Sequence, residues 1–160
     1  MGSVSIHNST RQQNVVAGLP FAEVAKKVVP GWDISLAFVG STKARALNMQ
    51  LRKKEYVPNV LSYVVGNKSA EIIICPTEAA KQAPDFKLPA SSFLLLLFIH
   101  GLLHIKGMAH GVTMEQCERK LVATFVTGDA RPLPNETTHR NRNRHRHLSG
   151  EDGRRRRSRL

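Results

Sequence analysis

Three histidines close together in the sequence are the side chains best suited to chemistry. His100 and His104 are four residues apart, so on a helix their rings lie on the same face and can approach one point. Gly107 can end that helix, and the chain can then fold back to bring in His110 as a third ligand. Imidazole nitrogens suit Zn²⁺, and three protein ligands leave one position open for water that the metal activates. The spacing predicts a site for one zinc ion per chain.

The residue after the first histidine restricts the kind of hydrolysis that such a site performs. In the zinc peptidase signature HExxH, a glutamate at that position acts as the general base. Here the position holds Gly101, and no acidic residue lies between His100 and His110. A peptidase-like metallohydrolase is therefore disfavoured. A structural zinc in a non-catalytic protein is a further alternative, because Glu115 or Cys117 could supply a fourth ligand.

The segment that carries the histidines is strongly apolar. From Ala90 to Lys106 it predicts a long buried helix that ends at Gly107. A membrane span over Leu88–Ile105 is the alternative, but two histidines one turn apart are costly in lipid, so a core helix is favoured.

The remaining sequence alternates between strand and helix patterns. Helical spacing runs over 13–29, where Pro20 leaves the start of the helix open. Further helices are expected from a cap at Ser41 or Thr42 to 51, over 76–83 and over 114–126. Strands are expected over 4–7, 32–39, 59–65 and 70–75. The two last strands are joined by Gly66-Asn67-Lys68, which is typical of a hairpin. This order predicts an α+β domain in which helices flank a mixed sheet of about four strands, with the metal site on the long apolar helix.

Charge divides the chain into two parts. The 160 residues include 24 basic and 12 acidic ones, a formal net charge of +12. Residues 131–160 alone contain ten arginines and three acidic residues, with little to bury. We therefore expect a folded domain over residues 1–127 and a disordered arginine-rich tail over 128–160. Such a polycation is attracted to RNA phosphates of any sequence, although a solvated tail without a partner is the plain alternative.

The cysteines and the first residues of the chain indicate the cellular compartment. Cys75 and Cys117 are the only cysteines, which favours a reducing compartment and core positions for both thiols. The first residues contain neither a basic leader nor an apolar stretch, so no signal peptide is expected. A cytoplasmic protein without membrane association is the expectation.

Two segments resemble the signatures of one family. The stretch HGLLHIKGMAH, from His100 to His110, resembles HGxLHLxGxDH of the YbeY family, bacterial endoribonucleases also called rRNA maturation factors. The stretch from Leu47 to Tyr63 resembles the family's LNxxYRxxDxPTDVLSF. The order of elements agrees with the family from about Val4 to Val126.

The resemblance implies specific roles. The three histidines match the family's zinc ligands, Arg52 matches its functional arginine facing the metal cleft, and Ser62 matches a residue lining that cleft. Without the resemblance, a solvated arginine and a hydroxyl bonded to backbone are the alternatives. The implied activity is cleavage of single-stranded RNA in 16S rRNA 3′-end maturation and ribosome quality control, with ribosomal RNA and the small ribosomal subunit as partners. No oligomeric state is predicted.

The chain departs from the family pattern beside the third ligand. Ala109 replaces the usual aspartate, so any hydrogen bond that this carboxylate would accept behind the ligands is missing. Further departures are Leu51 before Arg52 and Val57-Pro58 before the strand. The change at Ala109 removes no ligand but is expected to weaken metal binding or alter ligand orientation.

Overall fold

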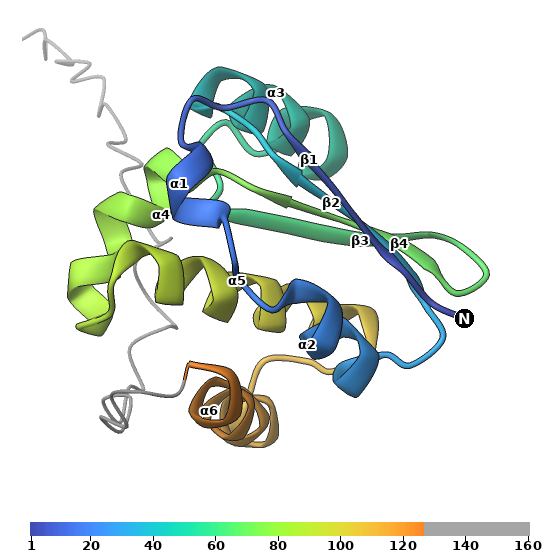
Figure 1. Ribbon diagram of the computed structural model, residues 1–160. Coiled ribbons are helices and arrows are strands. Elements are labelled where there is room, and N and C mark those ends of the chain that lie inside the picture. The colour runs from blue at the N-terminus through green and yellow to red at the C-terminus, as the bar shows by residue number, and fades with distance from the viewer. Residues whose placement is uncertain (127–160) are drawn as a thin grey trace, which may run out of the picture.

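The computed structural model describes residues 1–126, so the expected tail over 128–160 lies outside the described residues (Figure 1). Along the chain the elements are β1 (Val4–Asn8), α1 (Gln13–Val16), α2 (Phe21–Val28), β2 (Asp33–Phe38), α3 (Ser41–Arg52), β3 (Val60–Gly66), β4 (Ser69–Ile74), α4 (Pro76–Gln82), the 3₁₀ helix η1 (Ala83–Phe86), α5 (Ala90–Ile105) and α6 (Val112–Phe125).

The strands form one mixed sheet in the order β1-β2-β4-β3. β1 pairs with β2 and β2 with β4 in parallel. α1 and α2 lie in the first connection, and α3 and β3 in the second, so both are long enough for a parallel crossover. β3 and β4 form the predicted antiparallel hairpin. The fold class expected from the sequence, an α+β domain with a mixed four-stranded sheet, is confirmed.

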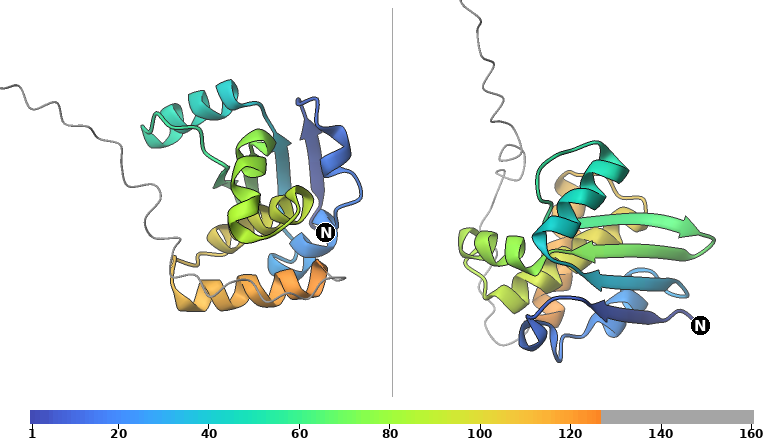
Figure 2. Two further views of the ribbon diagram at one scale, coloured as in Figure 1. Left: turned by 90° about the vertical axis from the view of Figure 1, so that its left-hand side faces the viewer. Right: turned by 90° about the horizontal axis from the view of Figure 1, so that it is seen from above.

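The two faces of the sheet are covered unequally. α5 packs across one face with α2 and α4 beside it and α6 outside it, whereas α3 lies on the opposite face (Figures 1 and 2). Alternate side chains of β2 and β4, such as Leu36 and Ile72, enter the large core beneath α5. A smaller cluster that includes Leu61 and Ile73 lies under α3. The expected metal-bearing helix and the helix that carries Arg52 are therefore on opposite faces.

Two details concern how the helices begin. The helical spacing over 13–29 is divided between two helices, and α2 begins directly after Pro20, the residue that left the start open. Gly18 has φ of 77°, so the chain turns between α1 and α2. The predicted side-chain cap of α3 is wrong. Gly40 occupies the cap position, and the Ser41 hydroxyl lies 3.8 Å from the thiol sulfur of Cys75 instead.

α5 is a core helix. Eleven of its residues are buried, including Phe93, Phe98 and Leu102. Within residues 1–126, no single helix is long and apolar enough to cross a membrane. The segments Pro76–Phe86 and Ala90–Ile105 have the required length and hydropathy only when taken together, and the chain bends by 102° between them.

Candidate metal centre

α5 brings two histidines to one point. His100 and His104 lie one turn apart and are partly exposed, while their neighbours Ile99, Gly101 and Leu103 are buried. The Nε2 atoms of the two rings are 3.0 Å apart. Two nitrogen ligands of a tetrahedral zinc are separated by about 3.3 Å, so this spacing suits a shared ion.

The turn after α5 returns the chain toward these rings. Gly107 has φ of 95°, which glycine adopts without strain. Its amide donates to the His104 carbonyl at 2.9 Å, and the Met108 amide donates to the Leu103 carbonyl at 3.0 Å. These two bonds form a Schellman motif, which reverses the chain at the helix end. The sequence expectation that Gly107 ends the helix is confirmed.

His110, brought back by this turn, completes the cluster. Its ring centroid lies 5.1 Å from that of His100 and 4.5 Å from that of His104. One ligand atom from each of the three rings lies within 4.8 Å of the others. Glu115 and Cys117 do not belong to this group, and within residues 1–126 no other set of three or more such residues has this geometry. The cluster can hold a metal ion with three imidazoles.

The hydrogen bonds behind the rings suit metal binding. The Nδ1–H of His104 donates to the Met108 carbonyl at 3.1 Å, and the Nδ1–H of His100 donates to the Glu118 carboxylate. Because both Nδ1 atoms carry the hydrogen, both Nε2 atoms present a lone pair to the shared point. The donor set of this chain therefore fits a zinc-like ion.

Sequence reasoning missed Glu118. Glu115 and Cys117 were considered only as a fourth ligand in the alternative of a structural zinc, whereas Glu118 is the acidic residue of the last helix that is buried. A buried acidic residue needs a partner, and His100 is that partner. Although position 109 holds alanine, Glu118 still places a carboxylate behind one of the histidines.

The electrostatic surroundings favour neutral imidazole at His104. Burial lowers the pKa of His104, and the neighbouring His100 and His110 rings lower it further. A neutral imidazole is the form that binds metal, so fewer protons compete with the ion at mildly acidic pH.

Ser62 lies on the face of the sheet that packs against α5. A Cβ placed on Gly101 would lie 3.4 Å from the Ser62 Cβ and 3.3 Å from two carbons of Ile72. The helix therefore lies close to the sheet beside His100. It also follows that position 101 faces the sheet, which explains in physical terms why no glutamate base stands there.

Arg52 ends α3 on the opposite face of the sheet. Its Nη1 donates to the Tyr56 hydroxyl at 3.3 Å. The fully buried Asn48 donates to the Tyr56 carbonyl at 2.9 Å, and Lys53 turns the chain with φ of 57°. Asn48 thus fixes the loop that follows the arginine.

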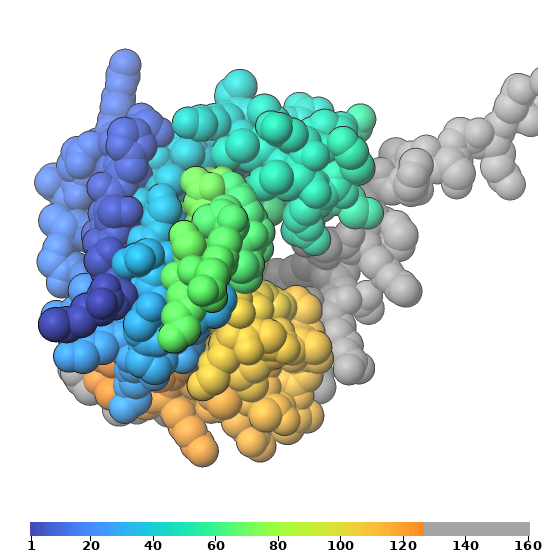
Figure 3. Space-filling model, turned by 90° about the vertical axis from the view of Figure 1, so that its right-hand side faces the viewer, coloured from blue at the N-terminus to red at the C-terminus, as the bar shows by residue number. Residues whose placement is uncertain are grey.

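The surface of α3 and the end of α5 are seen on the same side of the molecule. Figure 3 shows α3 in teal above and the end of α5 in yellow below, with a recess between them beside the green hairpin. Figure 2 shows both elements at the β3 edge of the sheet. This arrangement brings the two family segments toward one recess from opposite faces of the sheet.

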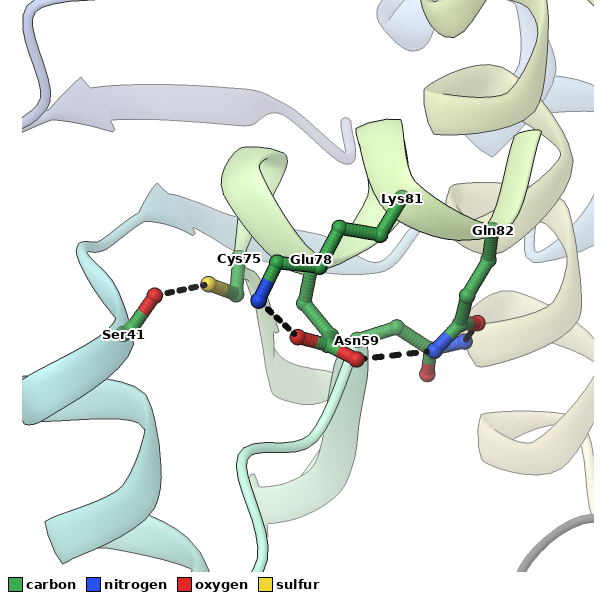
Figure 4. Close-up of polar contacts among 6 residues, drawn as sticks. All are labelled: Ser41, Asn59, Cys75, Glu78, Lys81 and Gln82. Atoms are coloured by element: carbon green, nitrogen blue, oxygen red, sulfur yellow. Dashed lines mark hydrogen bonds and ion pairs between the residues drawn. The ribbon is translucent and has the colours of Figure 1, made fainter. Parts of the chain in front are cut away.

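A separate polar cluster ties β3 to α4 (Figure 4). The Asn59 side chain donates to Gln82 at 2.8 Å, and Glu78 accepts from Gln82 at 3.2 Å and from Lys81 at 3.4 Å. Asn59 therefore anchors the start of a strand. Both cysteines are free, and Cys75 is buried.

Comparison with known proteins identifies the family. A family model described as Endoribonuclease YbeY matches residues 3–125, so the chain belongs to the YbeY family, as the two segments indicated. Relatives named Endoribonuclease YbeY include those of Polynucleobacter asymbioticus, 36% identical over 81 residues (48% of this chain and 52% of that protein), and Bdellovibrio bacteriovorus, 28% identical over 123 residues (76% and 79%).

Two further relatives match over part of their length, and one solved structure has a similar fold. The relative from Aromatoleum aromaticum, also named Endoribonuclease YbeY, is 28% identical over 101 residues, or 58% of this chain and 66% of that protein. The match to the Azoarcus relative spans only 43% of that protein. A solution structure from Thermotoga maritima aligns with a TM-score of 0.57 at 23% identity, covering 76% of this chain and 87% of that one, which shows a shared fold.

Proposed function

We propose that this protein is a zinc-dependent endoribonuclease that cuts single-stranded RNA. The observation that carries the proposal is the convergence of His100, His104 and His110, with the first two Nε2 lone pairs directed to one point. Membership of the YbeY family supports RNA as the substrate. A zinc ion held there would supply a Lewis acid and activate water for attack on the phosphodiester.

The side chains around the histidines would perform the remaining tasks. The forked guanidinium of Arg52 would hold a phosphate through two N–H donors and stabilise negative charge as it develops. The Ser62 hydroxyl would line the same cleft and contact the RNA. Met108 and Glu118 would keep the two helix imidazoles in the tautomer that binds metal.

The cellular role we propose is ribosomal RNA processing. Family membership supports a part in 16S rRNA 3′-end maturation and ribosome quality control on the small subunit, in the cytoplasm. The two free thiols are consistent with that reducing compartment. The arginine-rich residues 128–160 would add sequence-independent attraction to RNA, and deleting them should reduce the salt dependence of RNA binding. An unchanged salt dependence would leave them with no such role.

Two other functions are less well supported. A structural zinc normally has four protein ligands, and the cluster in residues 1–126 offers three. A peptidase would need a base near the first histidine, but position 101 faces the sheet.

The test is cleavage of a labelled single-stranded RNA by the zinc-loaded protein, with the same sequence as a duplex for comparison. We expect the single strand alone to be cut. Arg52→Glu should lose cleavage and keep its zinc, whereas Arg11→Glu, an exposed arginine beyond the opposite edge strand β1, should remain active. Equal cleavage by wild type and Arg52→Glu would remove Arg52 from the mechanism, and no cleavage by wild type would refute the proposed activity.

A further inference from the structure

The positive charge of the described chain is concentrated on one helix. Residues 1–126 contain 14 basic and eight acidic residues. The stretch from Ser41 to Lys54 contains five of the basic residues and none of the acidic ones, and all five are exposed. The stretch comprises α3 and the first two residues after it, so this helix presents an unbalanced positive surface.

Two arginines and a methionine form a strip along α3. Arg45, Met49 and Arg52 follow the spacing i, i+4, i+7, which places them in one row on a helix. Ala44 and Asn48 are buried on the side facing the sheet. Both arginines are exposed, and Met49 keeps 38% of its surface accessible between them.

The length of the strip matters for its ligand. Seven residues of helix separate the two arginines by about 10.5 Å along the axis. Two cations spaced in this way match successive phosphates of an extended nucleic-acid strand. An apolar side chain between two cations also offers a surface on which a nucleobase can pack. A row of charged side chains alone offers no such surface.

We infer that this strip of Arg45, Met49 and Arg52 binds the single-stranded RNA next to the phosphate that is cut. Arg45 contacts a second phosphate two helical turns from Arg52, and Met49 packs against a base between them. The inference rests on the proposed function, since it takes Arg52 to lie at the scissile phosphate. RNA is favoured over an acidic protein because α3, which carries the strip, faces the same recess as the end of α5, the helix of the metal cluster (Figure 3).

The test uses the full-length, zinc-loaded protein and a labelled single-stranded oligoribonucleotide at several salt concentrations. Arg45→Ala should weaken binding roughly five- to tenfold and reduce the salt slope by about one, because one cation–phosphate contact is lost. Zinc content should be unchanged, since Arg45 is not one of the residues that could hold the metal ion. Arg11→Ala is the matched control and should bind as wild type does.

A second variant separates the base contact from simple charge. Met49→Ala should weaken binding of the oligoribonucleotide but leave binding of inorganic polyphosphate, which has no bases, as in wild type. Arg45→Ala should weaken both. An equal effect of Arg45→Ala on polyglutamate and RNA would instead indicate a docking site for acidic proteins and would overturn the inference.

The possible failures are distinguishable. If Arg45→Ala binds RNA as Arg11→Ala does, while Arg52→Glu has lost cleavage, the inference that the strip binds RNA is wrong. The proposed function would then still stand. If the wild-type protein neither binds nor cuts single-stranded RNA, both are wrong.

Discussion

The carboxylate of Glu118 on α6 accepts a hydrogen bond from Nδ1 of His100 on α5, and so connects the last described helix to the metal cluster. The contact orients the imidazole, because a ring whose Nδ1 is engaged directs Nε2 toward the point it shares with His104. α6 packs its buried Met114 and Val122 into the core, so the carboxylate is held by a helix that is itself anchored. The helix after the histidines is thus part of the site.

Replacing this carboxylate should weaken metal binding without unfolding the protein. For Glu118→Gln we expect zinc affinity to fall about 10- to 100-fold, since the amide is a weaker acceptor. Competition with a chromogenic chelator measures the change. Glu115→Gln, on the same helix but outside the ligand cluster, is the control. Equal affinities for the two variants would show that the contact does not matter for the metal.

Enlarging residue 101 should destabilise the fold. A Cβ added at Gly101 would lie 3.3 Å from two carbons of Ile72 and 3.4 Å from the Ser62 Cβ, so Gly101→Val forces α5 away from the sheet. Overpacking of this kind costs about 1–3 kcal/mol of unfolding free energy. Urea denaturation measures it, with Gly66→Val on β3 as control, because the nearest contact there is 3.9 Å away. A Gly101→Val protein as stable as wild type would contradict the close approach.

Removing the Asn48 side chain should cost stability at α3. Asn48 is fully buried and donates to the Tyr56 carbonyl, so Asn48→Ala leaves that acceptor without its donor. We expect a loss of about 1–3 kcal/mol in unfolding free energy. The exposed Gln50→Ala should change stability far less. If both variants unfold at the same urea concentration, Asn48 does not fix the loop.

Stability should fall at alkaline pH through Tyr63. Burial, followed by the hydrogen bond to Glu71 and its charge, raises the pKa of Tyr63 from 10.0 to about 12. A raised pKa means that the folded state favours the neutral phenol, so the contribution is complete below pH 10 and is lost as pH rises toward 12. Urea midpoints at pH 9 and pH 11 should therefore differ more for wild type than for Tyr63→Phe. The same difference in both proteins would exclude this contribution.

Local patterns predicted most of the fold. Apolar periodicity located the four strands and the long helix over Ala90–Ile105, and Gly107 marked its end. The pattern left the helix start open over 13–29, where apolar spacing continues through Gly18 and Pro20 although the helix does not. Turn chemistry outweighed periodicity at that point.

In the candidate site, too, some residues could be predicted from local sequence and others could not. The histidines are close in sequence and share a helix and its turn, so spacing alone could indicate them. Glu118 could not be chosen over Glu115, because its contact with His100 depends on how α6 packs on α5, across 18 positions in the sequence. The packing of Gly101 likewise depends on the sheet, and no local pattern encodes it.

Zinc titration of the chelator-treated protein, with single-stranded RNA cleavage followed at each step, tests the central claim most directly. Cleavage should be absent without metal, rise in proportion to added zinc and stop rising at about one equivalent per chain. His104→Ala should take up no zinc at these concentrations and cut no RNA. Undiminished cleavage by the metal-free protein, or full zinc binding by His104→Ala, would contradict the account.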